Sequence, residues 1–379
     1  MIEVITDRAG VERLAEPWAA LASRSADPFL RHDCALASID AFCGPARPLV
    51  YVLRQGGDVQ AIAAFRAVRR AGVKRLETLT RPLAEPSGLL YANDAALGVV
   101  VDAVLKGRMP LMLGRMAEGG AEARAFRQGL HRWPPLGTAA RKDQSVWVSL
   151  PDDQGILEGT LSSNRRRDLR RKWRRAEQHG PVAFTCVEPT AETAPAVLEA
   201  AYRIEAASWK GRNGTAILMS PRYRRFFDTF GTALAREGRL FVFFLRFGTQ
   251  PAAMRIAAAC GGRLWELKIG YDERFSACSP GFLLTHETLR WCCGRGFEVF
   301  EFLGQAETWE FTWDSQARDY VSVNIHPRSI TGALSRAQDA GWAAAKAGMR
   351  RIKMDRAARK SRARRGPGAP PEKARPSAL

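Results

Sequence analysis

Two carboxylates occupy positions where a protein could use them to accept protons. Glu205 lies in the segment 194–209, whose apolar residues recur at helical spacing, so its carboxylate lies beside an apolar face. Asp272 follows an apolar strand pattern and precedes the sequence Ser279-Pro280-Gly281-Phe282. Removal of water from a carboxylate raises its pKa, and a raised pKa suits a general base. We therefore predict Glu205 and Asp272 as catalytic residues; the alternative for each is an ion pair with one of the many arginines.

The sequence Ser279-Pro280-Gly281-Phe282 is typical of the start of a helix. Serine is a preferred N-cap, proline fits the first turn, and Gly281 lets a ligand approach the backbone. The first N–H groups of a helix have no partner within the helix and commonly bind phosphate. We predict these four residues as a phosphate seat, against the simpler alternative of an ordinary helix start.

A basic cluster precedes both features. Eight of the twelve residues 164–175 are basic and one is acidic, and helical spacing puts Leu169, Trp173 and Ala176 on one narrow apolar stripe. The pattern predicts a helix over 164–179 that docks by this stripe and exposes its arginines, among them Arg170, Arg171 and Arg174. Such a face attracts anionic substrates; the alternatives are a merely solvated face or a nucleic-acid contact.

The net charge of +19 belongs mainly to two segments. Residues 164–175 contribute +7 and residues 350–379 contribute +9, which leaves +3 for the rest of the 379-residue chain. Residues 357–379 contain four prolines and no apolar periodicity, so we expect a disordered basic tail. The tail is either a solubilising appendage or a weak contact for an anionic membrane or RNA.

Cysteine usage and the absence of apolar runs predict a cytoplasmic protein. The seven cysteines form no Cys-x-x-Cys pair, which argues against both a disulfide framework and a structural metal site. The N-terminal sequence carries acids where a signal peptide needs an apolar run, and charges interrupt every apolar segment well short of a membrane span.

The elements that must position these residues fall into two similar halves. Residues 1–150 begin with an amphipathic helix, then give three strands, LVYVLR, VQAIAAFRAVRR and VKRLETL, separated by glycine turns. The same order of strands and turns recurs in residues 151–335 as RLFVFFLRF, AAMRIAAAC and RLWELKIGYD. We predict an α+β fold of two mixed, mainly antiparallel sheets flanked by helices, followed by a C-terminal helix over 336–356.

Several motifs in this order resemble the FemAB-related GNAT acyltransferases, including the CelD-like proteins of cellulose and exopolysaccharide gene clusters. The resemblance spans roughly 162–313, and the motifs that carry it are the basic helix, Glu205 with Ser208-Trp209-Lys210-Gly211, Gly270-Tyr271-Asp272, Ser279-Pro280-Gly281-Phe282, and Glu301 with Gly304. It implies tandem GNAT-like domains and acyl transfer from a thioester such as acyl-CoA to an amine or hydroxyl. It also implies that residues 279–282 contact the donor. The predicted substrate-binding residues are Trp209, Lys210, Glu301, Arg170, Arg171 and Arg174, and the arginines would attract either a phosphorylated donor or an anionic acceptor.

The sequence departs from the family at two positions. The glycine-rich phosphate loop of ordinary GNAT enzymes is reduced to Gly281, and the family's tyrosine-lysine pair is replaced by Trp309-Glu310. The predicted function is acyl transfer, most simply of acetyl, from acyl-CoA to a small-molecule or saccharide-linked acceptor in exopolysaccharide or envelope biosynthesis, without a metal. The alternatives are a Fem-like transferase that uses aminoacyl-tRNA and a non-catalytic nucleic-acid-binding protein on a GNAT scaffold.

Overall fold

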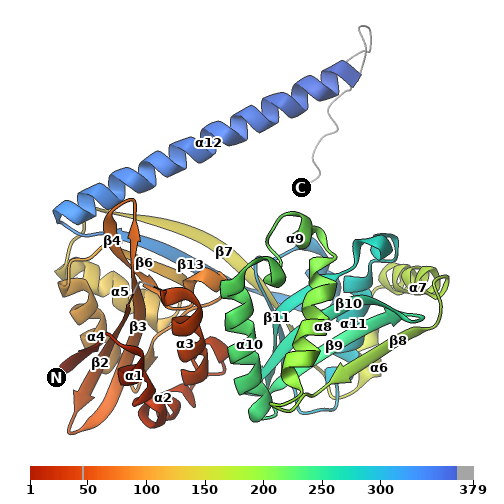
Figure 1. Ribbon diagram of the computed structural model, residues 1–379, viewed down its shortest axis with the longest axis horizontal. Coiled ribbons are helices and arrows are strands. Elements are labelled where there is room, and N and C mark those ends of the chain that lie inside the picture. Colours follow the sequence, from red (N-terminus) through yellow and green to blue (C-terminus); the bar gives the residue numbers. More distant parts are fainter. Residues whose placement is uncertain (45–46, 365–379) are drawn as a thin grey trace.

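The computed structural model describes residues 1–44 and 47–364, and the first half of the chain alternates helices with strands (Figure 1). Its elements are β1 (Ile2–Ile5), α1 (Arg8–Glu12), α2 (Ala15–Ala22), η1 (Pro28–Leu30), α3 (His32–Ser38), η2 (Ile39–Cys43), β2 (Pro48–Gln55), β3 (Asp58–Arg70), β4 (Val73–Thr78), η3 (Arg81–Leu83), β5 (Leu90–Tyr91), α4 (Asp94–Lys106), β6 (Leu111–Ala117), α5 (Ala121–Arg132) and β7 (Gly137–Ser149).

The second half repeats this plan and adds the basic helix α7 at its start. Its elements are α6 (Gln154–Gly159), α7 (Ser163–Glu177), β8 (Val182–Val187), α8 (Ala194–Ala206), α9 (Trp209–Arg212), η4 (Ile217–Met219), α10 (Pro221–Arg236), β9 (Leu240–Phe247), β10 (Gln250–Cys260), β11 (Arg263–Tyr271), η5 (Glu273–Cys278), α11 (Pro280–Cys292), β12 (Val299–Leu303), η6 (Thr308–Thr312), β13 (Ser315–His326) and α12 (Ile330–Arg364).

All these strands belong to one mixed sheet. Their order is β1-β2-β3-β4-β6-β13-β7-β12-β11-β10-β9-β8, with β5 paired to β3 beside this path. The predicted meanders are the antiparallel sets β2-β3-β4 and β9-β10-β11, and each continues into a parallel pair, β4 with β6 and β11 with β12. The predicted α+β class with tandem GNAT-like halves is confirmed, but the two expected sheets are joined into one.

The two halves exchange strands at the centre of the sheet. The long strand β7 pairs along its whole length with β13 and, through its last residues, with β12 of the second half. In turn β13, from the end of the second half, pairs with β6 of the first. The sequence boundary at residue 150 thus coincides with the end of β7, but the sheet continues across it.

Three expected helices differ from the prediction. The N-terminal amphipathic helix follows a strand, β1, and is divided into α1 and α2. The segment 194–209 breaks after Ala206, because Ser208 is extended and its hydroxyl accepts a hydrogen bond from the N–H of Lys210, which starts α9. The C-terminal helix begins at Ile330 and runs to Arg364, beyond the predicted 336–356. Residues 365–379, the greater part of the predicted disordered tail, lie outside the described residues.

Helix α12 is anchored by its first turns and then leaves the protein body (Figure 1). The buried guanidinium of Arg75 in β4 donates to Asp339 at 2.5 Å and to Gln338 at 2.6 Å. From residue 340 to 349 every side chain is exposed, including Trp342. Ion pairing with the first half therefore holds the start of this helix in place.

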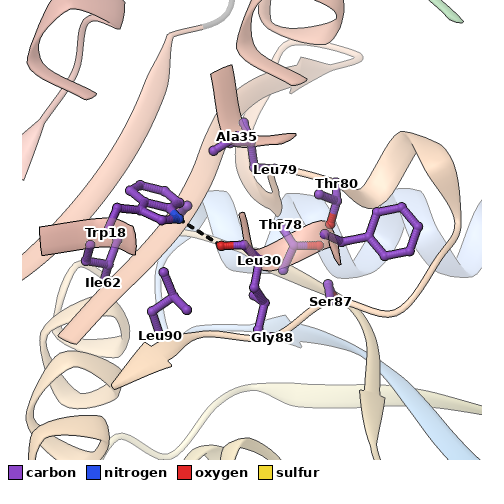
Figure 2. Close-up of a pocket in the computed structure, with 12 residues that line it drawn as sticks. Trp18, Leu30, Ala35, Ile62, Thr78, Leu79, Thr80, Ser87, Gly88 and Leu90 are labelled. Atoms are coloured by element: carbon purple, nitrogen blue, oxygen red, sulfur yellow. Dashed lines mark hydrogen bonds between the residues drawn. The ribbon is translucent and has the colours of Figure 1, made fainter. Parts of the chain in front are cut away.

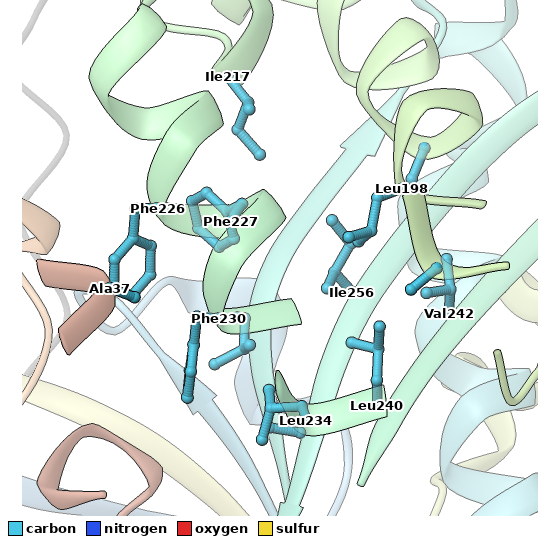
Figure 3. Packing of buried hydrophobic residues seen from close by; sticks show 14 of the residues in the cluster. Ala37, Leu198, Ile217, Phe226, Phe227, Phe230, Leu234, Leu240, Val242 and Ile256 are labelled. Atoms are coloured by element: carbon cyan, nitrogen blue, oxygen red, sulfur yellow. The ribbon is translucent and has the colours of Figure 1, made fainter. Parts of the chain in front are cut away.

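An apolar core on one face of the sheet joins the halves. Helices α8 and α10 pack on β9 and β10, and Figure 3 shows Ala37 of the first half beside Phe226 of α10. The Phe42 ring stacks on Phe226 with 5.5 Å between centroids. Burial of large aromatic side chains on both sides of the contact gives the halves a fixed relation to each other.

Candidate functional site

A cavity of about 580 Å³ opens where β11 and β12 diverge. The two parallel strands pair only through 263–265 and 299–301, so the later residues of β11 and the end of β12 form facing walls. The start of α11, the short helix α9 and Lys172 of α7 complete the lining. This volume is within the range of small-molecule binding sites.

The predicted phosphate seat lies at this cavity. Ser279, Gly281 and Phe282 line it, while Pro280 is buried in the first turn of α11. Ser279 does not cap the helix with its side chain: its backbone is left-handed (φ 53°, ψ 57°) and its hydroxyl makes no cap hydrogen bond. A Cβ on Gly281 would approach Tyr271 to 3.5 Å, an ordinary contact, so only a larger side chain would fill the space in front of the helix.

Two carboxylates that the sequence analysis did not select lie in the cavity wall. Burial raises the pKa of Glu310 to about 8; the nearby Glu266 and Glu307 add to this shift and a hydrogen bond from the Glu307 N–H opposes it. Burial also raises the pKa of Glu266 on β11. In the sequence, Glu310 is noted only as a departure from the family pattern. Its raised pKa depends on burial, which the sequence does not show.

Glu266 has a buried cationic partner. Its Oε2 lies 2.7 Å from Nη2 of Arg255, a fully buried side chain on β10, and the same nitrogen donates to Thr285 of α11 at 2.6 Å. The arginine also lies over the Phe300 ring, 4.9 Å from its centroid. This pair favours the ionised form of Glu266 against the effect of burial, whereas Glu310 has no ion pair among the described residues.

Glu205 lies behind the cavity and holds a residue that lines it. Its Oε2 accepts a hydrogen bond from the N–H of Ile217 at 2.9 Å, and its Oε1 lies 3.5 Å from Nζ of Lys210. Lys210 donates to the carbonyl of Ile269 at 2.6 Å, on the open edge of β11. A Cβ on Gly270 would come within 2.8 Å of the Glu205 backbone, which explains the glycine in Gly270-Tyr271-Asp272.

Asp272 caps the turn before the phosphate seat and does not line the cavity. Its carboxylate accepts hydrogen bonds from the backbone and side chain of Arg274. Burial alone would raise the pKa of Asp272, but these hydrogen bonds outweigh burial and hold the pKa below its usual value. The catalytic roles of Glu205 and Asp272 stay predictions, and this geometry favours a positioning role for both.

The predicted substrate-binding residues outside the basic helix divide into two groups. Trp209 and Lys210 line the cavity. Glu301, on β12, is buried, bonds to Arg263 at 2.5 Å and to Arg318 at 3.1 Å, and does not line the cavity. Its contacts are those of a satisfied ion pair in the sheet.

The basic helix docks by the stripe that its sequence predicts. Ala176 is buried, Leu169 and Trp173 are half-buried, and Arg170, Arg171 and Arg174 are exposed. Lys172 leans toward the cavity with its ammonium 4.2 Å from the Phe282 ring centroid, and it is paired to Asp168. Lys172 therefore contributes to the cavity wall, whereas Arg170 lines a separate hollow between α7 and α11 together with His286.

Other hollows are poorer candidates for catalysis. The cavity around Trp18, Ile62 and Thr78 in Figure 2 measures only about 30 Å³, enough for ordered water. A groove of about 820 Å³ at the β3-β4 hairpin is lined by arginines, and its one carboxylate, Glu77, is paired with Arg66 and Arg70. Within the described residues, no three His, Cys, Asp or Glu side chains are grouped to hold a metal, and no helix is both long and apolar enough to cross a membrane.

Comparisons with known proteins agree with this architecture. Residues 163–310 match the family model described as the acetyltransferase (GNAT) domain. The structure resembles a conserved protein of unknown function from Bacteroides thetaiotaomicron (9% identity, 86% of this chain and 100% of that chain, TM-score 0.52). It also resembles the C-terminal domain assigned to a lysylphosphatidylglycerol synthetase of Agrobacterium fabrum (11% identity, 87% of this chain and 96% of that chain, TM-score 0.51).

A weaker similarity links the chain to FemX (10% identity, 73% of this chain and 87% of that chain, TM-score 0.47). Among curated protein sequences no match to this chain is found. The family match and the structural similarities establish a GNAT-type acetyltransferase fold, whose matched region includes α7 and ends at Glu310.

Proposed function

We propose that this protein is an acyltransferase that moves an acyl group, most simply acetyl, from acyl-CoA to an amine or hydroxyl. The observation that carries the proposal is Glu310: a carboxylic acid with a pKa raised to about 8, in the wall of a cavity between diverging strands of a GNAT-type fold. A general base with a pKa near neutrality can accept a proton in the transition state and release it afterwards.

The reaction needs one proton acceptor and one group to stabilise an oxyanion. The acceptor nitrogen or oxygen attacks the thioester carbonyl carbon and forms the new C–N or C–O bond, the C–S bond breaks, and CoA leaves as its thiolate. Glu310 takes the proton from the attacking atom and passes it to the thiolate or to water. Lys210, held at the cavity edge by Glu205, is the cation available to the carbonyl oxygen as negative charge develops.

The residues around the cavity suit an acyl-CoA donor. At the start of α11, the N–H of Gly281 has no acceptor among the described residues, whereas Pro280 has no N–H and those of Ser279 and Phe282 bond to the carbonyls of Ser276 and Ser279. The Gly281 N–H and the positive charge of Lys172 beside Phe282 suit the pyrophosphate. The diverging strands leave an open edge on β11 for the pantetheine arm. In this arrangement Glu205 and Asp272 are positioning residues: one fixes Lys210 and the other fixes the turn that leads into Ser279.

A second donor is favoured by the exposed arginines of α7. A face of this kind, on the helix that also contributes Lys172 to the cavity wall, suits a polyanion, so an aminoacyl-tRNA donor, as the resemblance to Fem-type enzymes implies, is the alternative. A third hypothesis is nucleic-acid binding without catalysis. The proposed setting, cytoplasmic modification of a saccharide-linked acceptor for exopolysaccharide or envelope biosynthesis, rests on the CelD-like resemblance alone.

The test is a thermal-unfolding titration of the full chain with acetyl-CoA, longer acyl-CoAs, free CoA and bulk tRNA at low and moderate salt. A ligand at 100 times its Kd should stabilise the protein by about 2.7 kcal/mol. Saturable stabilisation by a CoA species at moderate salt supports the proposal and ranks the donors. Stabilisation by tRNA alone supports the aminoacyl-tRNA alternative if it survives moderate salt and charge-driven binding if it does not.

A further inference from the structure

A second cavity, of about 540 Å³, lies where the two halves of the chain meet, lined by both of them. It lies on the sheet, because its lining comes from β6, β13 and β7, which are paired with one another, and from residues 81–85 that follow β4. Gly304 and Gln305 line both cavities, so the two adjoin at the end of β12.

The second cavity contains an arginine whose hydrogen bonds are incomplete. Arg115 of β6 has only 6% of its side chain exposed, and its Nε donates to Asp143 at 2.6 Å. The nearest carboxylate to Nη1, that of Glu85, is 3.7 Å away, beyond hydrogen-bond distance. Among the described residues neither Nη1 nor Nη2 has a hydrogen-bond partner.

Such a side chain is costly unless something binds it. A buried charged donor without a partner loses its hydration and gains no hydrogen bond in exchange. Such unpaired donors are rare in native proteins. Tyr320 orients the guanidinium, whose central carbon lies 4.7 Å from the ring centroid, and Asp143 fixes its Nε edge. The two terminal nitrogens are thus held in a fixed fork, the geometry that receives two oxygens of one carboxylate or phosphate.

We propose that this second cavity is the acceptor subsite and that Arg115 binds a carboxylate or phosphate group of the acceptor. The inference rests on the proposed acyl transfer and adds to it the chemical class of the acceptor. An acceptor anchored at Arg115 extends past Gly304 and Gln305, so its amine or hydroxyl enters the cavity that contains Glu310.

The charges around the subsite permit an anion to enter. Asp143 is already paired with Arg115, and burial raises the pKa of Glu85, which favours its neutral form. Arg81 and Arg141 line the same cavity, with Arg141 exposed at its rim. Their positive charge raises the local concentration of anionic ligands.

Three related amino sugars test the proposal. Glucosamine carries no anionic group, glucosamine 6-phosphate carries a phosphate, and muramic acid carries a carboxylate. Calorimetric titration of the full chain, with and without CoA, should give at least one anionic sugar a Kd about 10-fold lower than that of glucosamine. The two anionic sugars distinguish phosphate from carboxylate. Equal binding of all three, or binding of none, would overturn the proposal.

The variants assign the preference to Arg115. Arg115→Met should abolish the preference for the anionic sugar and leave the Kd for acetyl-CoA within about 2-fold, whereas Arg124→Met on the exposed face of α5 should change neither. Ala140 lies at an exposed position of β7 that lines the cavity, so Ala140→Phe should block sugar binding without removing any charge. This variant provides the test if Arg115→Met does not fold. A preference that survives both variants contradicts the subsite.

The outcome is separable from that of the proposed function. If wild-type protein binds no acyl-CoA species but binds an anionic sugar through Arg115, the donor assignment fails and the anion subsite stands. If acetyl-CoA binds and the Arg115-dependent preference is absent, the subsite fails and the donor assignment stands.

Discussion

The carboxylate of Glu85 accepts a hydrogen bond of 3.1 Å from the backbone N–H of Gly304, and this contact joins the first half of the chain to the wall of the second-half cavity. Ser145 of β7 donates to the carbonyl of Gly304 at 3.1 Å, so both backbone polar groups of Gly304 are held by the first half. The preceding Leu303 has φ 58°, a left-handed conformation that is strained for leucine. Side chains of one half therefore fix a strained turn in the site of the other.

Glu85→Ala should release this turn. The Gly304 N–H would lose its partner, and an unsatisfied buried donor costs about 1–3 kcal/mol, which urea unfolding should detect. We also expect a lower kcat with acetyl-CoA as donor, because Gly304 lines the cavity that contains Glu310. Glu85→Gln keeps an oxygen acceptor and is the matched control; equal losses in both variants would contradict a role for the hydrogen bond.

Gly281→Phe should abolish binding of the acyl-CoA donor while the protein stays folded. The added ring would occupy the space in front of α11, where a Cβ lies only 3.5 Å from Tyr271. Gly281→Ala adds only that Cβ, so its effect on the Kd for acetyl-CoA should be small. Calorimetry measures the Kd and circular dichroism the fold; unchanged donor affinity in Gly281→Phe would show that the phosphate seat is elsewhere.

The pH dependence of kcat/KM should follow Glu310. The carboxyl must be ionised to accept a proton, so activity should rise with pH and level off above pH 8, the region of its pKa. Glu310→Gln should lower kcat by about 10²–10⁴-fold and remove this ascending limb. Glu307→Gln, a change at the neighbouring carboxylate, should retain the limb; a limb that persists in Glu310→Gln would assign the base to another group.

The same residue should destabilise the folded protein at alkaline pH. Its pKa is raised on folding, so between the unfolded value near 4.5 and about 8 the native state binds more protons than the unfolded state. Stability therefore falls as pH rises through this window. Glu310→Gln lacks this dependence and should unfold at a higher temperature than wild type at pH 8.5, with a smaller difference at pH 5; a constant difference would contradict the raised pKa.

The triple substitution Arg170→Ala, Arg171→Ala and Arg174→Ala should weaken the binding of any polyanionic ligand in a salt-dependent way. Each lost phosphate contact should reduce the slope of log K against log salt by about 1. Arg124, Arg127 and Arg132 on α5 offer a matched control, since replacing them removes the same charge from the other half. Filter binding of bulk tRNA over a salt series measures the slope, and identical slopes in both triple variants would show that α7 has no specific role.

Local pattern was sufficient to predict the strands of both meanders. Strands β2, β3, β9 and β10 bury largely apolar runs, and glycine turns separate them from each other and from β4 and β11, so that information lies within a few adjacent residues. The docking stripe of α7 was predicted for the same reason. Helical periodicity fixes which side chains share a face before any partner is known.

Long-range placement was not predictable in this way. The sequence of β13, SQARDYVSVNIH, gave no indication that it would lie between β6 and β7, because its neighbours come from a remote part of the chain. Nothing in the local sequence distinguishes Arg115 or Glu310 from the other arginines and glutamates of the chain. Their importance follows from burial and from what fails to contact them, which only the assembled fold reveals.

The position of β13 constrains how this protein can be synthesised. The first half lacks a central strand of its sheet until Ser315–His326 has left the ribosome, so β6 and β7 emerge with unpaired edges long before their partner exists. Domains that contain all their own strands can fold in order during translation. In this protein the first half stays incomplete until β13 has been synthesised. A truncated chain that ends before residue 315 would expose the unpaired edges of β6 and β7 and aggregate through them.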